Sequence, residues 1–133
     1  MSILEFRDTL AVALNNIDDV RCGPYGYLQG NISAPQAVLD YEVTGPIVFA
    51  HGAYGYTLHV YLYHKRASER SAQEFFDRHR DPHDDTSLWR IIEDTDYGTS
   101  ADYARCTNAS AIQAVDYAGS DLLMVDFTVE AVL

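Results

Sequence analysis

Two stretches of this chain alternate their side chains with the two-residue period of a β-strand. The first covers residues 56–64, where alternate positions are either aliphatic and apolar or aromatic and polar. The second covers residues 122–132, where Leu123, Val125, Phe127 and Val129 oppose Met124, Asp126, Thr128 and Glu130. Successive strand residues point to opposite faces of a sheet, so each stretch predicts a strand with one face on an apolar core. The chain must therefore build a sheet.

Helical spacing of apolar residues appears in three other segments. Ser2 followed by Glu5 fits a capping box, and the apolar period that follows predicts a helix over residues 3–17. A second helix is expected from residue 67 until Pro82 ends it, with Ala72, Phe75, Phe76 and His79 on one stripe. A third, shorter helix is expected over residues 87–94, capped by Asp84, Asp85 or Thr86.

Shorter strand patterns complete the predicted fold. We expect strands at residues 37–43, 102–108 and 112–117, a strand beginning at residues 20–22, and a hairpin turn at Gly119-Ser120. Gly and Pro residues predict a long loop over residues 23–35, a break at Gly45-Pro46 and a second loop over residues 45–55. The sequence thus predicts one α+β domain, residues 1–133, with a largely antiparallel sheet and about three helices packed on it.

The composition restricts where the chain works and what it binds. Its apolar runs are far shorter than the roughly 20 residues of a membrane helix, and Glu5, Arg7 and Asp8 interrupt any secretion signal. We therefore expect no membrane contact and no disulfide between Cys22 and Cys106. Nine Lys and Arg against twenty Asp and Glu give a net charge of −11, the reverse of what phosphate binding needs. Such a charge commonly serves solubility, although an acidic surface can also face DNA without binding it.

Motifs for covalent chemistry are missing from the sequence. It contains no GxSxG, GxGxxG or GxxxxGK[ST] motif. The segment 79–85, His-Arg-Asp-Pro-His-Asp-Asp, offers metal-ligating side chains, and a small metal-dependent hydrolase using His79, Asp81, His83 and Asp84 is one alternative. Pro82 separates the two histidines, however, and the aspartates are equally suited to capping helices. Histidines 51, 59 and 64 have no predicted carboxylate partner, so we predict no catalytic residue, cofactor or metal.

Tyrosine is the unusual component, with ten residues in the chain. Tyrosine is enriched where a surface is buried against a partner, because its ring packs while its hydroxyl still forms hydrogen bonds. Tyr61 and Tyr63 could equally line the core, whereas the loop tyrosines favour an interface. The predicted assembly interface comprises Tyr25, Tyr27, Gln29, Asn31, Tyr54, Tyr56, Tyr61 and Tyr63.

Four segments taken together resemble a known family. They are SILEFRDTLAVAL at the N-terminus, YTLHVYLYHK running into RASERSAQEFFDRH, the short SLWRIIED, and the closing LLMVDFTVEAVL. Their order, and the junction at residues 65–73 above all, resembles the tail-terminator proteins of long-tailed, non-contractile phages. The similarity of order covers nearly the whole chain.

This resemblance implies a structural virion protein and not an enzyme. It implies a ring of copies of this chain, six-fold, that caps the tail tube, stops its polymerisation and gives the head–tail connector a joining surface. The subunit would be made in the host cytoplasm and reside at the head-proximal end of the tail, with genomic DNA passing through the lumen without specific binding. Loops 23–35 and 45–55 would supply the contacts. A head-completion, connector or tail-tube protein of the same virion is the nearest alternative.

Overall fold

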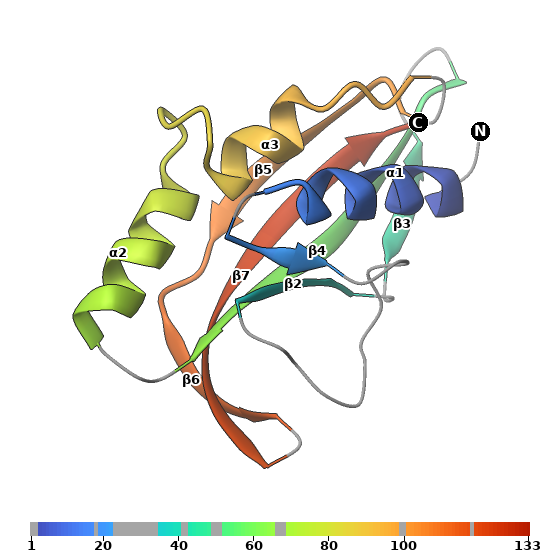
Figure 1. The fold of residues 1–133 in the computed structure, drawn as a ribbon. Helices are drawn as coiled ribbons and strands as arrows, with labels where there is room; N and C mark the ends of the chain where they lie inside the picture. The colour runs from blue at the N-terminus through green and yellow to red at the C-terminus, as the bar shows by residue number, and fades with distance from the viewer. Residues whose placement is uncertain are drawn as a thin grey trace.

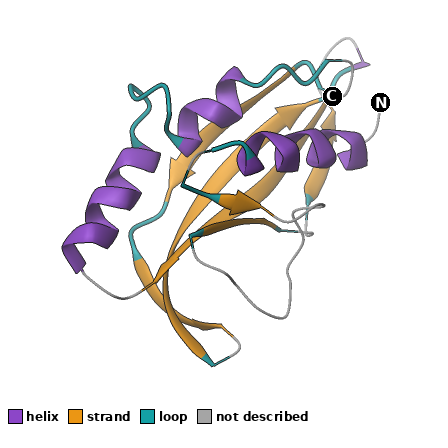
Figure 2. Ribbon diagram, viewed as in Figure 1, coloured by secondary structure: helices purple, strands orange, loops and turns teal. Residues whose placement is uncertain are grey.

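A computed structural model describes residues 3–17, 19–22, 35–40, 43–48, 52–65, 69–98, 101–117 and 119–133. Three helices and seven strands follow one another along this part of the chain (Figures 1 and 2). Their order is α1 (Ile3–Asn15), β1 (Arg21–Cys22), β2 (Gln36–Leu39), β3 (Thr44–Val48), β4 (Tyr54–Lys65), α2 (Glu69–Arg80), α3 (Leu88–Asp94), β5 (Tyr103–Ala109), β6 (Gln113–Tyr117) and β7 (Ser120–Val132).

The sheet is built on the two long strands that the alternation predicted. β4 and β7 pair antiparallel without interruption from Gly55 opposite Val132 to Lys65 opposite Leu122. The strand order is β1-β2-β4-β7-β5; β3 pairs with the first part of β4 and β6 with the first part of β7. Every pairing is antiparallel except β1 with β2, which is parallel. The predicted α+β fold with a largely antiparallel sheet is therefore confirmed.

The helices bury their apolar stripes on one face of the sheet. Figure 1 shows α1 and α3 lying across this face, with α2 beside them. The alternation within β4 is as predicted, since Leu58, Val60 and Leu62 are fully buried under the helices. The strands β2 and β7 add Leu39 and Phe127 to this core, and the helices add Phe6, Leu10, Leu14, Phe76, Leu88 and Ile92. No helix of the described residues is long and apolar enough to cross a membrane.

A second, smaller apolar cluster lies on the opposite face of the sheet. It joins Val38, Tyr63 and Leu122, with Tyr61, Val115 and Met124 packed at its edge. This cluster explains one difference from the sequence prediction. The alternation at residues 37–43 predicted a strand with one buried face, whereas all four residues of β2 are buried because both of its faces are covered.

The predicted break at Gly45-Pro46 is wrong, because β3 runs through it. The register between β3 and β4 shifts between Thr44 and Ile47, so the strand bulges where Gly45 and Pro46 stand. Gly45 has φ +136°, and a Cβ there would lie 2.7 Å from the carbonyl oxygen of Gly55. Only glycine permits this approach, and proline is tolerated at bulges and edges. The predicted loop 45–55 is thus largely strand, although residues 49–51 lie outside the described ranges.

The predictions for one hairpin turn and for the caps of two helices have different outcomes. The β6–β7 hairpin forms as predicted, with Tyr117 opposite Ser120 and Gly119 at φ +84° in the turn. It extends beyond the rest of the molecule in Figure 1. Helix α3, however, is capped by Ser87, whose hydroxyl accepts the Arg90 N–H, and not by the residues at 84–86. Ser2, the predicted cap of α1, lies outside the described residues.

Candidate functional site

The predicted interface residues are divided between two parts of the chain. Tyr25, Tyr27, Gln29 and Asn31 belong to the loop at 23–35, which the structure describes only at residue 35. The other four tyrosines all lie on β4. Because strand residues alternate, Tyr54 and Tyr56 share the parity of the helix-covered face, and Tyr61 and Tyr63 share that of the opposite face.

These four tyrosines differ in what they offer to a partner. Tyr54 is 44% exposed at the start of β4, and Tyr56 is half-buried. Tyr63 is only 6% exposed and belongs to the second apolar cluster, so it is a packing residue in this structure. The Tyr61 hydroxyl donates to Asp40 Oδ2 at 3.0 Å. Burial first, and this bond second, raise the pKa of Tyr61, which therefore keeps its proton. The prediction of an interface thus stands best for Tyr54.

His59 has the carboxylate partner that the sequence did not reveal. Its Nδ1 lies 2.8 Å from Asp126 Oδ1, and its ring stacks on that of Tyr61 with centroids 6.2 Å apart. Asp126 was out of reach of sequence reasoning because it lies on β7, and only the register brings it diagonal to His59. No described serine, threonine or cysteine hydrogen-bonds to the imidazole. The Ser110 hydroxyl accepts the Asp126 N–H and donates to the Ala111 carbonyl oxygen. The two side chains form a partly buried hydrogen-bonded pair on the sheet surface.

The segment 79–85 uses its polar groups to build the turn between α2 and α3. His79 is fully buried, and its Nδ1 accepts the Leu88 N–H at 3.0 Å. Burial lowers the pKa of His79 to about 4, so the ring is neutral and carries its proton on Nε2, 3.3 Å from Asp19 Oδ1. With that proton in place, the 3.3 Å approach of Arg78 Nη2 to Nε2 is not a hydrogen bond.

The neighbouring aspartates also serve the local backbone. Asp81 accepts the N–H of His83, and Asp84 accepts both the N–H and the hydroxyl of Thr86. Within the described residues, no three groups of the metal-ligating types come together. The hydrolase alternative therefore has no assembled ligand set in this part of the chain; Asp81 and Asp84 stabilise the turn between α2 and α3, while Ser87 caps α3.

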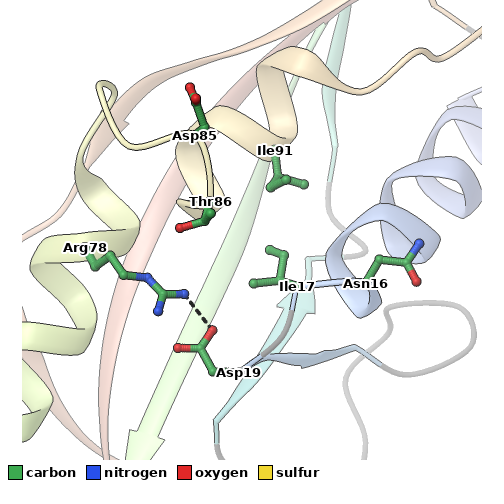
Figure 3. A pocket seen from close by; sticks show the side chains of 7 residues that line it. All are labelled: Asn16, Ile17, Asp19, Arg78, Asp85, Thr86 and Ile91. Atoms are coloured by element: carbon green, nitrogen blue, oxygen red, sulfur yellow. Dashed lines mark hydrogen bonds and ion pairs between the residues drawn. The ribbon is translucent and has the colours of Figure 1, made fainter.

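A cavity of about 260 Å³ opens between the end of α1 and the turn that precedes α3 (Figure 3). Arg78 reaches across it to Asp19, with Nη2 and Oδ1 2.9 Å apart. Ile17 and Ile91 form the apolar wall, and Asn16, Asp85 and Thr86 complete the lining. Because the one guanidinium is already paired with a carboxylate and a second carboxylate stands on the rim, the cavity does not favour an anion.

The exposed apolar surface of the sheet lies at its other end, around β3. All five residues of β3 are exposed, including Ile47 at 55% and Val48 at 74%. Val48 pairs with Tyr54 on β4, and Tyr103 on β5 is 48% exposed. Ile47 and Tyr103 line one hollow of about 120 Å³, together with Gly55, Tyr56, Thr57, Arg105, Glu130, Ala131 and Val132. We refer to Ile47, Val48, Tyr54 and Tyr103 as the β3 corner.

The β3 corner was only partly visible in the sequence. Tyr54 was predicted as an interface residue, but Ile47 and Val48 were placed in a loop and Tyr103 at a strand start without a role. The signal that could have found them is the short apolar run Ile47-Val48-Phe49 directly after a Gly-Pro pair, which is compatible with an edge strand. The charged side chains at the hollow, Arg105 and Glu130, are paired with each other at 2.9 Å.

Comparison of the chain with protein-family models and with curated proteins finds no match in either.

Proposed function

We propose that this chain is a structural virion protein, the ring-forming tail terminator of a long-tailed, non-contractile phage. In this role identical subunits close into a ring at the end of the tail tube, stop its growth and give the head connector a surface to join. The observation that carries the proposal is the β3 corner, where an edge strand exposes both faces and two aliphatic side chains to solvent.

An edge strand of this kind is suited to a partner. It presents unpaired N–H and C=O groups, and folded proteins normally protect such an edge with charge, a short strand or a covering element. β3 carries no charged residue in Thr44–Val48, and its two large apolar side chains, Ile47 and Val48, are exposed to solvent. Apolar groups gathered at an edge are characteristic of interaction surfaces. Assembly with another protein would remove this surface from water.

Other features agree with a structural role in a virion. The polar clusters of the described residues are used internally: Asp126 holds His59, Asp40 holds Tyr61, and Asp19 contacts both Arg78 and His79. The net charge of −11 suits a subunit whose ring surrounds DNA, because an acidic lumen repels phosphates and lets the genome pass. The resemblance of the four sequence segments to tail terminators supplies the specific identity of the proposal.

Mass measurement and electron microscopy of the purified protein test this function. The protein is examined by light scattering and negative staining, alone and after mixing with tail tubes that lack a terminator. We expect annular particles, or rings seated at tube ends. Rings that bind only isolated connectors would indicate a head-completion protein, and continuous tubes would indicate a tube protein. Monomers that ignore both tubes and connectors would refute assembly as the function.

A further inference from the structure

His79 joins two helices through a hydrogen bond between its side chain and the backbone of the next helix. It lies in the last turn of α2, and its Nδ1 accepts the N–H of Leu88, the first residue of α3, at 3.0 Å. Both residues are fully buried. The first N–H groups of a helix have no partner within that helix and need one from outside. The imidazole therefore serves α3 as a second cap, supplied by α2.

The turn between the two helices is held mainly by short hydrogen bonds. We refer to residues 81–87 as the α2–α3 turn. The Ser87 hydroxyl donates to the Asp81 carbonyl oxygen and accepts the Arg90 N–H. The Ser87 N–H donates to the carbonyl oxygen of Asp84. Within the turn only Ser87 is buried, and most of the other residues are exposed. A segment with so few buried contacts is of the kind that can open without unfolding of the whole protein.

Charged groups face the other nitrogen of the imidazole. Nε2 lies 3.3 Å from Asp19 Oδ1, in the segment after α1, and Arg78 Nη2 lies equally close. Asp84 of the α2–α3 turn is the third charged group that acts on the ring. From the sheet, His64 of β4 packs against Phe75, which packs in turn against the imidazole. Asp19 and Asp84 favour a positive charge on the ring, whereas Arg78 and burial oppose it.

A second proton on the ring would change its two contacts in opposite directions. The neutral ring carries its proton on Nε2, so the second proton goes to Nδ1 and turns this acceptor into a donor. Two donors, Nδ1–H and the Leu88 N–H, would then face each other, and the hydrogen bond between α2 and α3 would be lost. The positive charge would at the same time strengthen the contact of Nε2–H with Asp19. Protonation therefore separates α2 from α3 but not from the segment after α1.

We propose that His79 is an acid-sensitive switch: when its ring takes up a second proton, the α2–α3 turn opens locally while the sheet stays paired. The inference does not depend on the proposed function. A buried N–H without an acceptor is unfavourable, and opening of the exposed turn beside it lets water reach the Leu88 N–H. The pairing of β4 with β7 includes no residue of this turn. Asp85 and Thr86 line the cavity of Figure 3, so opening would remove one of its walls.

The size of the response follows from the two states of the turn. Burial lowers the pKa of His79 to about 4 in the closed turn, and an open turn would restore the ordinary 6.5. The closed turn is therefore fully favoured above pH 6.5, and this advantage is lost as the pH falls towards 4. Between pH 7 and pH 5 the equilibrium constant for opening should rise about 20-fold.

Native-state hydrogen exchange, followed by NMR, tests the switch. Exchange of the Ser87 and Leu88 N–H groups is measured at pH 7 and pH 5 in low concentrations of urea and corrected for the intrinsic pH dependence of exchange. The N–H groups of Val60 and Phe127, at the centre of the sheet, report global unfolding. The same measurement is made on His79→Asn, which keeps an acceptor but takes up no proton. The matched control is His83→Asn, at an exposed histidine of the turn.

The expected result separates local opening from global unfolding. The Leu88 N–H should exchange at a rate that low urea leaves unchanged, and its opening constant should rise about 20-fold from pH 7 to pH 5. The Val60 and Phe127 N–H groups should exchange far more slowly, at rates that urea increases. The acid response should disappear in His79→Asn and persist in His83→Asn. Leu88 exchange that depends on urea as steeply as that of Val60 would refute local opening in the unmodified chain alone. An acid response that persists in His79→Asn would show that another group takes up the proton.

Discussion

The buried histidine of α2 should make this protein sensitive to mild acid. His79 is fully buried, and burial lowers its pKa from the ordinary 6.5 to about 4. Asp19 and Asp84 oppose that shift and Arg78 adds to it, but burial is the largest cause. A histidine with a lowered pKa stabilises the fold while it stays neutral. Its contribution is therefore fully present above pH 6.5 and is lost as the pH falls towards 4.

The size of this effect follows from the two pKa values. Each pKa unit between the folded and unfolded states is worth about 1.4 kcal/mol. The fall of the His79 pKa from 6.5 to about 4 therefore lowers the free energy of unfolding by about 3 kcal/mol below pH 4. About 2 kcal/mol of this loss occurs between pH 7 and pH 5. The interval from pH 7 to pH 5 isolates the effect of His79, because ordinary carboxylates scarcely titrate there. A loss of this size is a large part of the stability of a small domain, roughly 5–15 kcal/mol.

Urea unfolding at pH 7 and pH 5 measures the effect. His79→Asn keeps an acceptor for the Leu88 N–H but cannot take up a proton, so its free energy of unfolding should change by less than about 0.5 kcal/mol between the two pH values. His83→Asn, at an exposed histidine of the same segment, should keep the full pH dependence. NMR titration of the His79 ring in the unmodified protein gives a second measure. Equal pH dependence in all three chains, or a ring that protonates near pH 6.5, would contradict the reasoning.

Three further predictions follow from the structure and the sequence. Gly45→Ala should lower the free energy of unfolding by about 2 kcal/mol, because the added Cβ would lie 2.7 Å from the Gly55 carbonyl oxygen. Gly98→Ala should lower it by only about 1 kcal/mol, because its Cβ meets no atom within 4 Å and only the positive φ is unfavourable. Equal losses for the two variants in urea unfolding would argue against the close approach at Gly45. Cys22 and Cys106 are free thiols, and burial raises the pKa of both. Both should therefore react with a thiol reagent at pH 8 far more slowly in the native protein than in urea. Rapid labelling of either thiol in the native protein would show that the core is open there. Replacing Tyr25 and Tyr27 together by alanine should weaken ring or tail assembly, scored by negative staining, without changing the melting temperature; unchanged assembly would move the contact away from that loop.

The elements with a sustained period could be predicted, and those set by distant partners could not. The alternation around Leu58 and Phe127 identified the two central strands and their buried faces, because burial on one side leaves a local pattern. β3 left no such pattern: its face is not covered, and its Gly45-Pro46 pair is typical of turns as well as of bulges. The both-sided burial of β2 depends on Tyr63 and Leu122, which no local window contains.

The candidate surfaces also divide into residues that local sequence could identify and residues that only distant pairing brings together. Tyr54 could be selected by residue type, but its neighbours at the β3 corner come from β3 and β5, which are brought together only by pairing with β4 and β7. The partner of His59 was missed for the same reason, since Asp126 lies on the last strand. In the segment 79–85 the sequence placed His79 on the apolar stripe of the second helix and His83 beyond Pro82, and in the structure His79 is buried and His83 is exposed.

The uninterrupted pairing of β4 with β7 also sets the order in which the chain can fold during synthesis. Val132 must meet Gly55 and Leu122 must meet Lys65, so the middle of the sheet forms only after the ribosome has released the last strand. Until then the strand that carries Leu58, Val60 and Leu62 lacks β7 as its neighbour, and the nascent chain exposes an apolar, aggregation-prone strand. Contacts between such distant residues slow folding. A chaperone that holds the chain during this interval would raise the yield of folded protein, and overexpression without it would favour aggregates.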